Sequence, residues 1–133
     1  TFGLEEIREE GGKTSFGAGY VCRRGVSHYR KLSLSSSSLL IDDEIKGFKR
    51  KAELRWRLAP GKWELVKVDG GVKTRNRDFP EFSILVNATV PLARCELTDG
   101  WESLHYCEKT PLPVLEIETN SNCRLTTEVR WSN

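Results

Sequence analysis

Strict alternation of apolar and polar residues dominates the chain from residue 28 onward, and it constrains the fold more than any other feature. In residues 52–58 the apolar side chains Ala52, Leu54, Trp56 and Leu58 alternate with charged ones. Successive strand residues point to opposite faces, so this pattern predicts a strand with one buried and one solvent-facing side. The same period recurs in residues 28–35, 63–68, 72–77, 82–90 and 123–131.

Turn-forming residues separate these alternating segments. Asp69-Gly70-Gly71 between two of them is a hairpin signal. Further turns are expected at residues 42–43, 59–61, 78–80, 98–100, 110–113 and 120–122. About eight to eleven short strands at this spacing predict an all-β fold, an antiparallel β-sandwich of two stacked sheets. Only residues 4–10 are compatible with a helical turn, and they contain few apolar positions.

Length and charge restrict the classes of protein that fit. A chain of 133 residues predicts one domain spanning residues 1–133, with a core that needs no metal or disulfide. Its net charge of +2 is too small to attract nucleic acid by a long-range field. No apolar run approaches the ~20 residues of a membrane span, so no membrane partner is expected. Because the chain begins at Thr1 without an initiator Met, we expect it to be part of a longer polypeptide.

The residues that bind metals are poorly arranged for that purpose. The four cysteines show no Cys-x-x-Cys spacing, and the two histidines, His28 and His105, are far apart, so neither a metal nor a cofactor is predicted. Asp42 and its acidic neighbours lack the oxygen spacing of a calcium loop, and we expect Asp42 to accept backbone N–H groups of a turn. Free thiols are favoured, although a Cys95–Cys107 pair stays open.

A series of short motifs in a fixed order spans most of the chain. It consists of Gly19-Tyr20, His28-x-Arg30, the run 39–47 with its acidic centre and final Gly, the segment 55–60, the segment 99–106, and the closing stretches 111–114 and 125–127. Together these motifs resemble the C-terminal β domain of the heparinase II/III-like polysaccharide lyases.

That resemblance implies a fragment of the β region of a larger lyase. Members of the family cleave acidic polysaccharides by β-elimination, using residues of an N-terminal helical toroid and a His-rich segment that this sequence lacks. The resemblance therefore implies no catalytic residue here, no activity for this chain alone, and a role in supporting the toroid and one wall of the substrate cleft. It implies the toroid of the same polypeptide as partner, an acidic polysaccharide as ligand of the parent, and a periplasmic or extracellular location.

Six residues are candidates for contact with a substrate. His28 and Arg30 share a strand face from which Tyr29 points away, and we expect a structural hydrogen-bonding role for His28. Arg55 and Arg57 belong to a basic series, whose ordinary interpretation is a solvated strand face. Trp101 and Tyr106 could stack on sugar rings, as could three other tryptophans at positions 56, 63 and 131. Two alternatives therefore stay open: an independent carbohydrate-binding module, and a sandwich that binds proteins.

Overall fold

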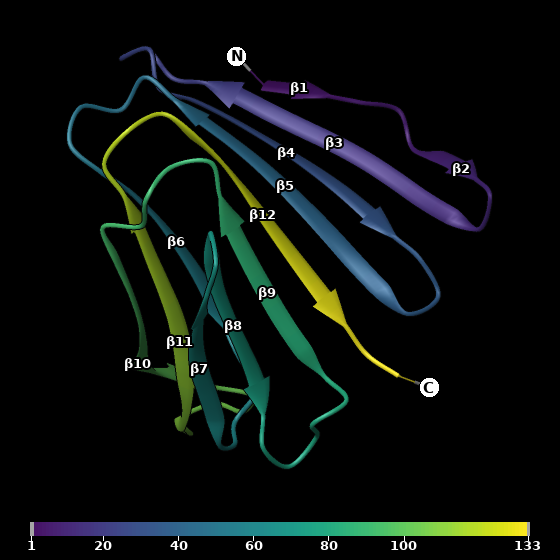
Figure 1. The fold of residues 1–133 in the computed structure, drawn as a ribbon, viewed down its shortest axis with the longest axis vertical. Coiled ribbons are helices and arrows are strands. Elements are labelled where there is room, and N and C mark those ends of the chain that lie inside the picture. Colours follow the sequence, from purple (N-terminus) through teal and green to yellow (C-terminus); the bar gives the residue numbers. More distant parts are fainter. Residues whose placement is uncertain (1, 133) are drawn as a thin grey trace.

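The computed structural model describes residues 2–132, and every regular element in that range is a β-strand (Figure 1). All strand pairs are antiparallel, and they form one sheet of nine strands and one of three. The prediction of an all-β fold with two stacked antiparallel sheets is therefore confirmed. The strands are β1 (Phe2–Leu4), β2 (Arg8–Glu10), β3 (Lys13–Val21), β4 (Ser27–Leu34), β5 (Ser38–Lys46), β6 (Ala52–Arg57), β7 (Trp63–Val68), β8 (Gly71–Asn76), β9 (Ser83–Ala88), β10 (Arg94–Glu102), β11 (Thr110–Thr119) and β12 (Cys123–Arg130).

The hydrophobic core lies between the small sheet and one half of the large sheet. The large sheet has the order β1-β3-β4-β5-β12-β9-β8-β7, with β2 also paired to β3, and the small sheet has the order β10-β11-β6. Leu115 and Ile117 of β11 pack in one cluster with Val86 of β9 and Leu125 of β12, and all four are almost completely buried. The alternating residues of β6 join this core through Leu54, as their pattern predicts.

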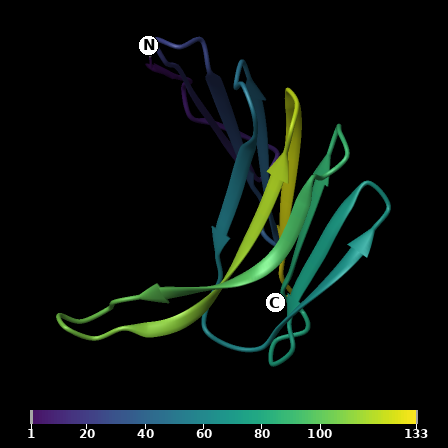
Figure 2. The ribbon, with the colours of Figure 1, turned by 90° about the vertical axis from the view of Figure 1, so that its left-hand side faces the viewer.

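The other half of the large sheet extends past the small sheet (Figure 2). Its inner face, the one that carries core residues elsewhere, exposes apolar side chains on β1, β3 and β4, beside the polar His28 and Arg30. Leu4, Tyr20 and Leu34 lie on this face by their register, and their exposed fractions are 64%, 49% and 47%. Nine strands therefore provide more inner surface than three strands can cover.

The hairpin of β10 and β11 also projects from the body of the sandwich (Figure 2). Strand β6 pairs with β11 only from Val114 onward, so residues 99–113 extend beyond it. We call residues 99–113 the arm. Its turn contains Cys107, the one described residue other than glycine with a positive φ, at 62°.

The arm corrects two predicted turns. Residues 98–100 lie within β10 and residues 110–113 begin β11, while the actual turn lies between the two strands. Position 100 has no room for a side chain, since a Cβ on Gly100 would lie 2.6 Å from Cγ2 of Val114. Pro111 and Pro113 fit because this end of β11 has a partner strand on one edge only, where proline's missing N–H leaves the ladder intact.

One further expectation from the sequence was wrong, and one segment that the sequence left undecided forms strands. Asp42 and Asp43 do not form a turn but lie in the middle of β5, which is hydrogen-bonded to β4 and β12. Asp42 accordingly does not cap a turn, and its side chain is 3.4 Å from Nε of Arg124. Residues 4–10 form parts of β1 and β2 in place of a helical turn. In both places pairing with neighbouring strands overrides the local preference of the residues.

The hairpin signal at residues 69–71 is confirmed, because Asp69 and Gly70 connect β7 to β8. Gly70 has a φ of 76°, which glycine adopts without strain. Gly71 is needed for a different reason. A Cβ at Gly71 would lie 1.9 Å from the carbonyl oxygen of Val86, so the close approach of β8 to β9 requires a residue without a side chain.

Replacing Gly71 with alanine should therefore destabilise the sandwich. The added methyl group forces β8 away from β9, and we expect the free energy of unfolding to fall by about 1–3 kcal/mol. Urea denaturation followed by tryptophan fluorescence measures the change. Gly3→Ala is the matched control, since a Cβ there meets nothing within 4 Å. Equal stability of the Gly71→Ala variant and the control would contradict the packing described here.

Candidate functional site

A buried carboxylate is the centre of the polar cluster that the His-x-Arg motif forms. Asp43 of β5 is completely buried and accepts hydrogen bonds from two sides. Arg30 donates from Nε at 2.6 Å and from Nη2 at 3.0 Å, and His28 Nε2 lies 2.7 Å from Oδ1 of the same carboxylate. A buried ionised carboxylate is tolerated only with such partners. The signal in the sequence is an aspartate at an inward position of an alternating strand.

This cluster also connects the two sheets. The guanidinium of Arg30 lies over the ring of Trp56 on β6, 5.0 Å from its centroid. Trp56 in turn donates from Nε1 to Oγ1 of Thr127 on β12, at 3.2 Å. The ring of His28 meets that of Tyr20 edge to face at 5.9 Å. His28 and Arg30 are thus held by neighbours on three sides, as expected of structural residues.

Tyr29 lies on the opposite face of β4 from His28 and Arg30, as the alternation predicts. Its ring covers Gly17 and Gly19 of β3, where a Cβ would lie 2.3 and 2.8 Å from Tyr29 atoms. A hydrogen bond from its hydroxyl to the Glu5 carboxylate raises the pKa of Tyr29. A raised pKa keeps this hydroxyl protonated, so it offers no phenolate that could take a proton. His28, Tyr29 and Arg30 therefore do not converge on one acid–base site.

Arg55 lies on the outer face of the small sheet, where it is surrounded by carboxylates. It pairs with Glu53 at 3.6 Å and with Glu116 at 3.2 Å, and Arg94 pairs with Glu118 on the same face. The Glu116 carboxylate hydrogen-bonds to Glu53 and raises the pKa of Glu53, while the pKa of Glu116 is lowered. The positive charges of Arg55 and Arg94 on this face are thus neutralised by neighbouring glutamates.

Arg57 and Trp101 are brought together where the arm leaves the small sheet. The guanidinium of Arg57 donates to the backbone carbonyl of Trp101. Arg55, Arg57 and Trp101 line one open cavity of about 420 Å³. Trp101 is 56% exposed, and Tyr106, farther along the arm, is 96% exposed and outside this cavity.

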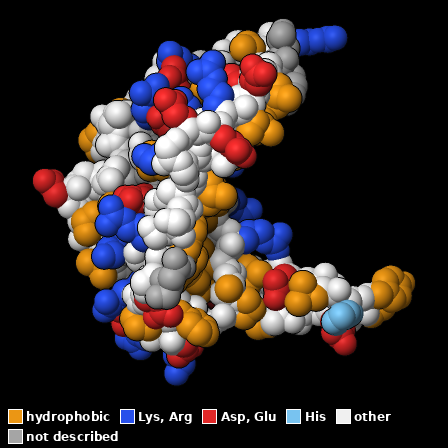
Figure 3. Space-filling view, turned by 90° about the vertical axis from the view of Figure 1, so that its right-hand side faces the viewer, with side chains coloured by type: hydrophobic (Ala, Val, Ile, Leu, Met, Phe, Trp, Pro, Cys, Tyr) orange, Lys and Arg blue, Asp and Glu red, His pale blue; other side chains and the backbone are white. Residues whose placement is uncertain are grey.

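The six candidate residues therefore occupy three separate places. His28 and Arg30 flank the buried carboxylate of Asp43, Arg55 and Arg57 meet Trp101 beside the arm, and Tyr106 stands alone. Seen from the side, the molecule has a hollow between the uncovered half of the large sheet and the arm, and hydrophobic side chains gather along it (Figure 3). We call this surface the hollow, with Leu4, Tyr20, Leu34 and Trp101 as its exposed apolar residues.

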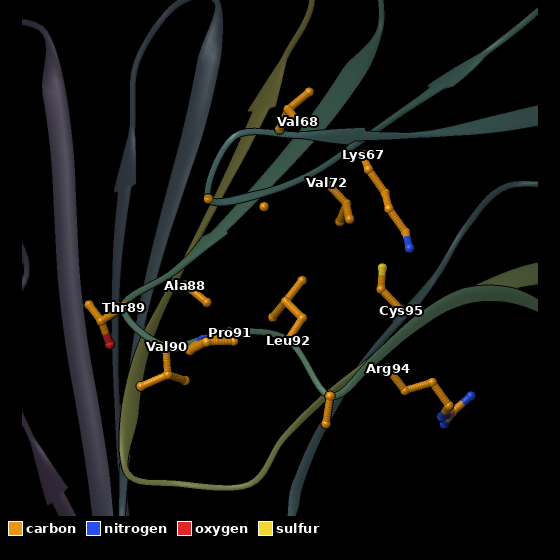
Figure 4. A pocket seen from close by; sticks show the side chains of 13 residues that line it. Lys67, Val68, Val72, Ala88, Thr89, Val90, Pro91, Leu92, Arg94 and Cys95 are labelled. Atoms are coloured by element: carbon orange, nitrogen blue, oxygen red, sulfur yellow. The ribbon is translucent and has the colours of Figure 1, made fainter.

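A second cavity, which sequence reasoning missed, opens at the end of the sandwich near the β7–β8 turn. It has a volume of about 490 Å³, in the range of small-molecule sites. Lys67 of β7 and Cys95 of β10 point toward each other on one side of it, with Val72 and Leu92 beside them (Figure 4). Burial raises the pKa of the Cys95 thiol, so this cysteine is not an activated nucleophile.

The cysteines and carboxylates of the described residues form neither a disulfide nor a metal site. All four cysteines are free, including Cys95 and Cys107. Among residues 2–132, no group of three or more His, Cys, Asp and Glu side chains is placed to hold a metal ion. In the same range no helix is long and apolar enough to cross a membrane.

Known proteins resemble this chain in structure and not in sequence. No family model and no curated protein matches it. A solved heparinase III aligns over 97% of this chain and 21% of its own length, with a TM-score of 0.77 and 14% identity. Heparan sulfate lyase HepC from Pedobacter heparinus aligns over 99% of this chain and 22% of its own, with a TM-score of 0.77 and 13% identity. Another heparinase III aligns over 99% of this chain and 21% of its own length, with a TM-score of 0.74 and 19% identity.

The fold is thus the one found in a β region of these lyases, which confirms the resemblance that the motifs indicate. This chain spans about a fifth of the length of the solved structures that it matches. The motif residues Gly19, His28 and Arg30 are explained by packing, since each contacts a buried or half-buried neighbour described above.

Removing the charge of Asp43 should destabilise the fold. In an Asp43→Asn variant, Arg30 loses its buried counter-ion, and we expect the free energy of unfolding to fall by about 3 kcal/mol. Chemical denaturation measures the effect. Asp42→Asn is the matched control, because Asp42 lies on the other face of β5 and pairs only with exposed Arg124; it should change stability by about 0.5 kcal/mol or less. Similar effects of the two substitutions would contradict a special role for Asp43.

Proposed function

We propose that this chain is a non-catalytic β domain of a heparinase-like lyase, one that supports the helical toroid of the same polypeptide and contributes a wall to the cleft for an acidic polysaccharide. The fold found in heparinase III, together with the small share of those lyases that it covers, supports the assignment to a larger protein. The parent would act by β-elimination, and its acid and base would come from outside these residues.

The observation that carries the proposal is the hollow. Soluble domains rarely leave a large contiguous apolar surface in water. Here the inner face of β1, β3 and β4 exposes Leu4, Tyr20 and Leu34, and the arm carries the exposed Trp101. A larger domain seated between them would cover both walls at once. The toroid is the occupant that the proposal names.

The chemistry of the described residues supports a non-catalytic role. β-Elimination from a uronic acid requires a base at the carbon that loses its proton and a donor for the leaving oxygen. His28 and Arg30 instead hold the buried Asp43, and Tyr29 faces the other side of the sheet.

A carbohydrate-binding module is the second candidate, and the cavity formed by Arg55, Arg57 and Trp101 favours it. A sugar could stack on Trp101 while a guanidinium binds its carboxylate or sulfate. The glutamates around Arg55 weaken this alternative, because they already neutralise the charge that would attract a polyanion.

The isolated chain should have no lyase activity. Incubated with heparin, heparan sulfate or alginate, it should release no unsaturated uronate, measured by its ultraviolet absorbance. An active polysaccharide lyase on the same substrates is the positive control. Turnover by the isolated chain that His28→Ala abolishes would show that these residues carry a complete site, which contradicts the proposal.

Polyanion binding by the isolated chain should be weak and salt-sensitive. Screened surface charge is expected to supply all of it, so calorimetry at ~0.15 M salt should detect no binding to heparin. Trp101→Ala should leave the weak binding at low salt unchanged. Binding that persists at this salt and disappears in the Trp101→Ala variant would favour the module, since ring stacking is not screened.

A further inference from the structure

A small aromatic cavity lies at the end of the sandwich where the β6–β7 connection, the β8–β9 connection and the residues after β12 meet. Its volume is about 290 Å³. Trp63, Phe79, Phe82 and Trp131 provide most of its walls, and Glu81 stands among them. The sequence makes Trp63 and Trp131 separate candidates for stacking on a sugar ring, and the fold places both in one cavity. It lies at the opposite end of the strands from the Lys67–Cys95 cavity.

The rings of this cavity are held in a corner arrangement. Trp63 and Phe82 meet edge to face at an interplanar angle of 82°, with their centroids 5.9 Å apart, so each ring fixes the orientation of the other. Trp63 is fixed by a hydrogen bond from Nε1 to the carbonyl of Ala59 at 2.8 Å. The turn that carries Phe79 and Phe82 is closed by a backbone hydrogen bond of 2.9 Å between them. These restraints preform the cavity before any ligand arrives.

The charge of the cavity has one sign. Glu81 is the charged residue among those that line it, and no described lysine or arginine is among them. The two arginines at the end of β8, Arg75 and Arg77, pair with Glu64 of β7. Aromatic faces also carry negative potential, so rings and carboxylate attract the same kind of guest.

We propose that this cavity binds a small organic cation that carries a trimethylammonium group. A compact cation can contact several of the aromatic side chains that line the cavity, and the Glu81 carboxylate complements its charge. A flat pyranose stacks best on one open face, and an acidic sugar would be repelled by Glu81. The site is separate from the hollow, so it stands or falls independently of the proposed lyase function.

Choline is the probe that tests this inference. Rings above and beside the guest shift its N-methyl protons upfield, and proton NMR titration of the intact chain measures both the shift and the affinity. We expect dissociation constants on the order of 1 mM. The matched ligand is the neutral carbon isostere of choline, in which a tert-butyl group replaces the trimethylammonium group. It should bind roughly tenfold more weakly.

Two variants locate the site. Glu81→Gln and Phe79→Leu should each weaken choline binding roughly three- to tenfold, because one removes the carboxylate and the other an exposed ring. Tyr106→Leu is the matched control, an exposed aromatic on the arm whose loss should change nothing. Both positions are exposed, so the variants should fold, which a circular dichroism spectrum checks.

Three results would overturn the inference. Equal binding of choline and its neutral isostere would show that the cavity is merely apolar and has no preference for charge. Choline binding unaffected by Glu81→Gln and Phe79→Leu, or absent altogether, would show that the cavity is no cation site. Tighter binding of Nα-acetyl-lysine N-methylamide than of choline would indicate that the cavity binds a lysine side chain of a partner protein instead.

Discussion

The unequal size of the two sheets is the constraint on which the rest of the structure depends. Three strands cannot cover nine, so the core forms only where β6, β10 and β11 face β12, β9, β8 and β7. Elsewhere the inner face of the large sheet stays open and exposes apolar side chains, and the arm continues past the last strand that could support it. The open face follows from the unequal number of strands and the arm from the shortness of β6, and both border the same hollow (Figure 3).

The Asp43 cluster lies at the boundary between the covered and uncovered halves. Arg30 belongs to β4, beyond the core, and its guanidinium reaches the Trp56 ring of the small sheet while bonding to Asp43. One cation therefore satisfies a buried carboxylate and closes the edge of the core. A histidine and an arginine thus lie where apolar packing ends, hydrogen-bonded to the buried carboxylate.

Much of the fold could be predicted from the sequence, because alternation identifies strands and the Asp69-Gly70 signal identifies a hairpin. The errors share a physical cause. Local preference predicts turns at Gly100, Pro111 and Asp43, yet each lies in a strand. Gly100 leaves room for the Val114 side chain, Pro111 lies where β6 no longer pairs with β11, and Asp43 is bound by Arg30. Which candidate residues lie together could not be predicted for a similar reason. Alternation gives the face of its own strand on which a side chain lies, and it does not show which strand lies opposite.

The interrupted outer edge of the large sheet bears on how the chain behaves at high concentration. β1 and β2 each contribute three residues, and both pair with the same side of β3, separated by residues 5–7. An open edge along the nine residues of β3 would template the addition of another strand, which is the first step toward fibrils. Two short segments with a break between them offer no continuous ladder. Residues 2–10 thus occupy this edge of β3 with two short segments, an arrangement that disfavours edge-to-edge assembly.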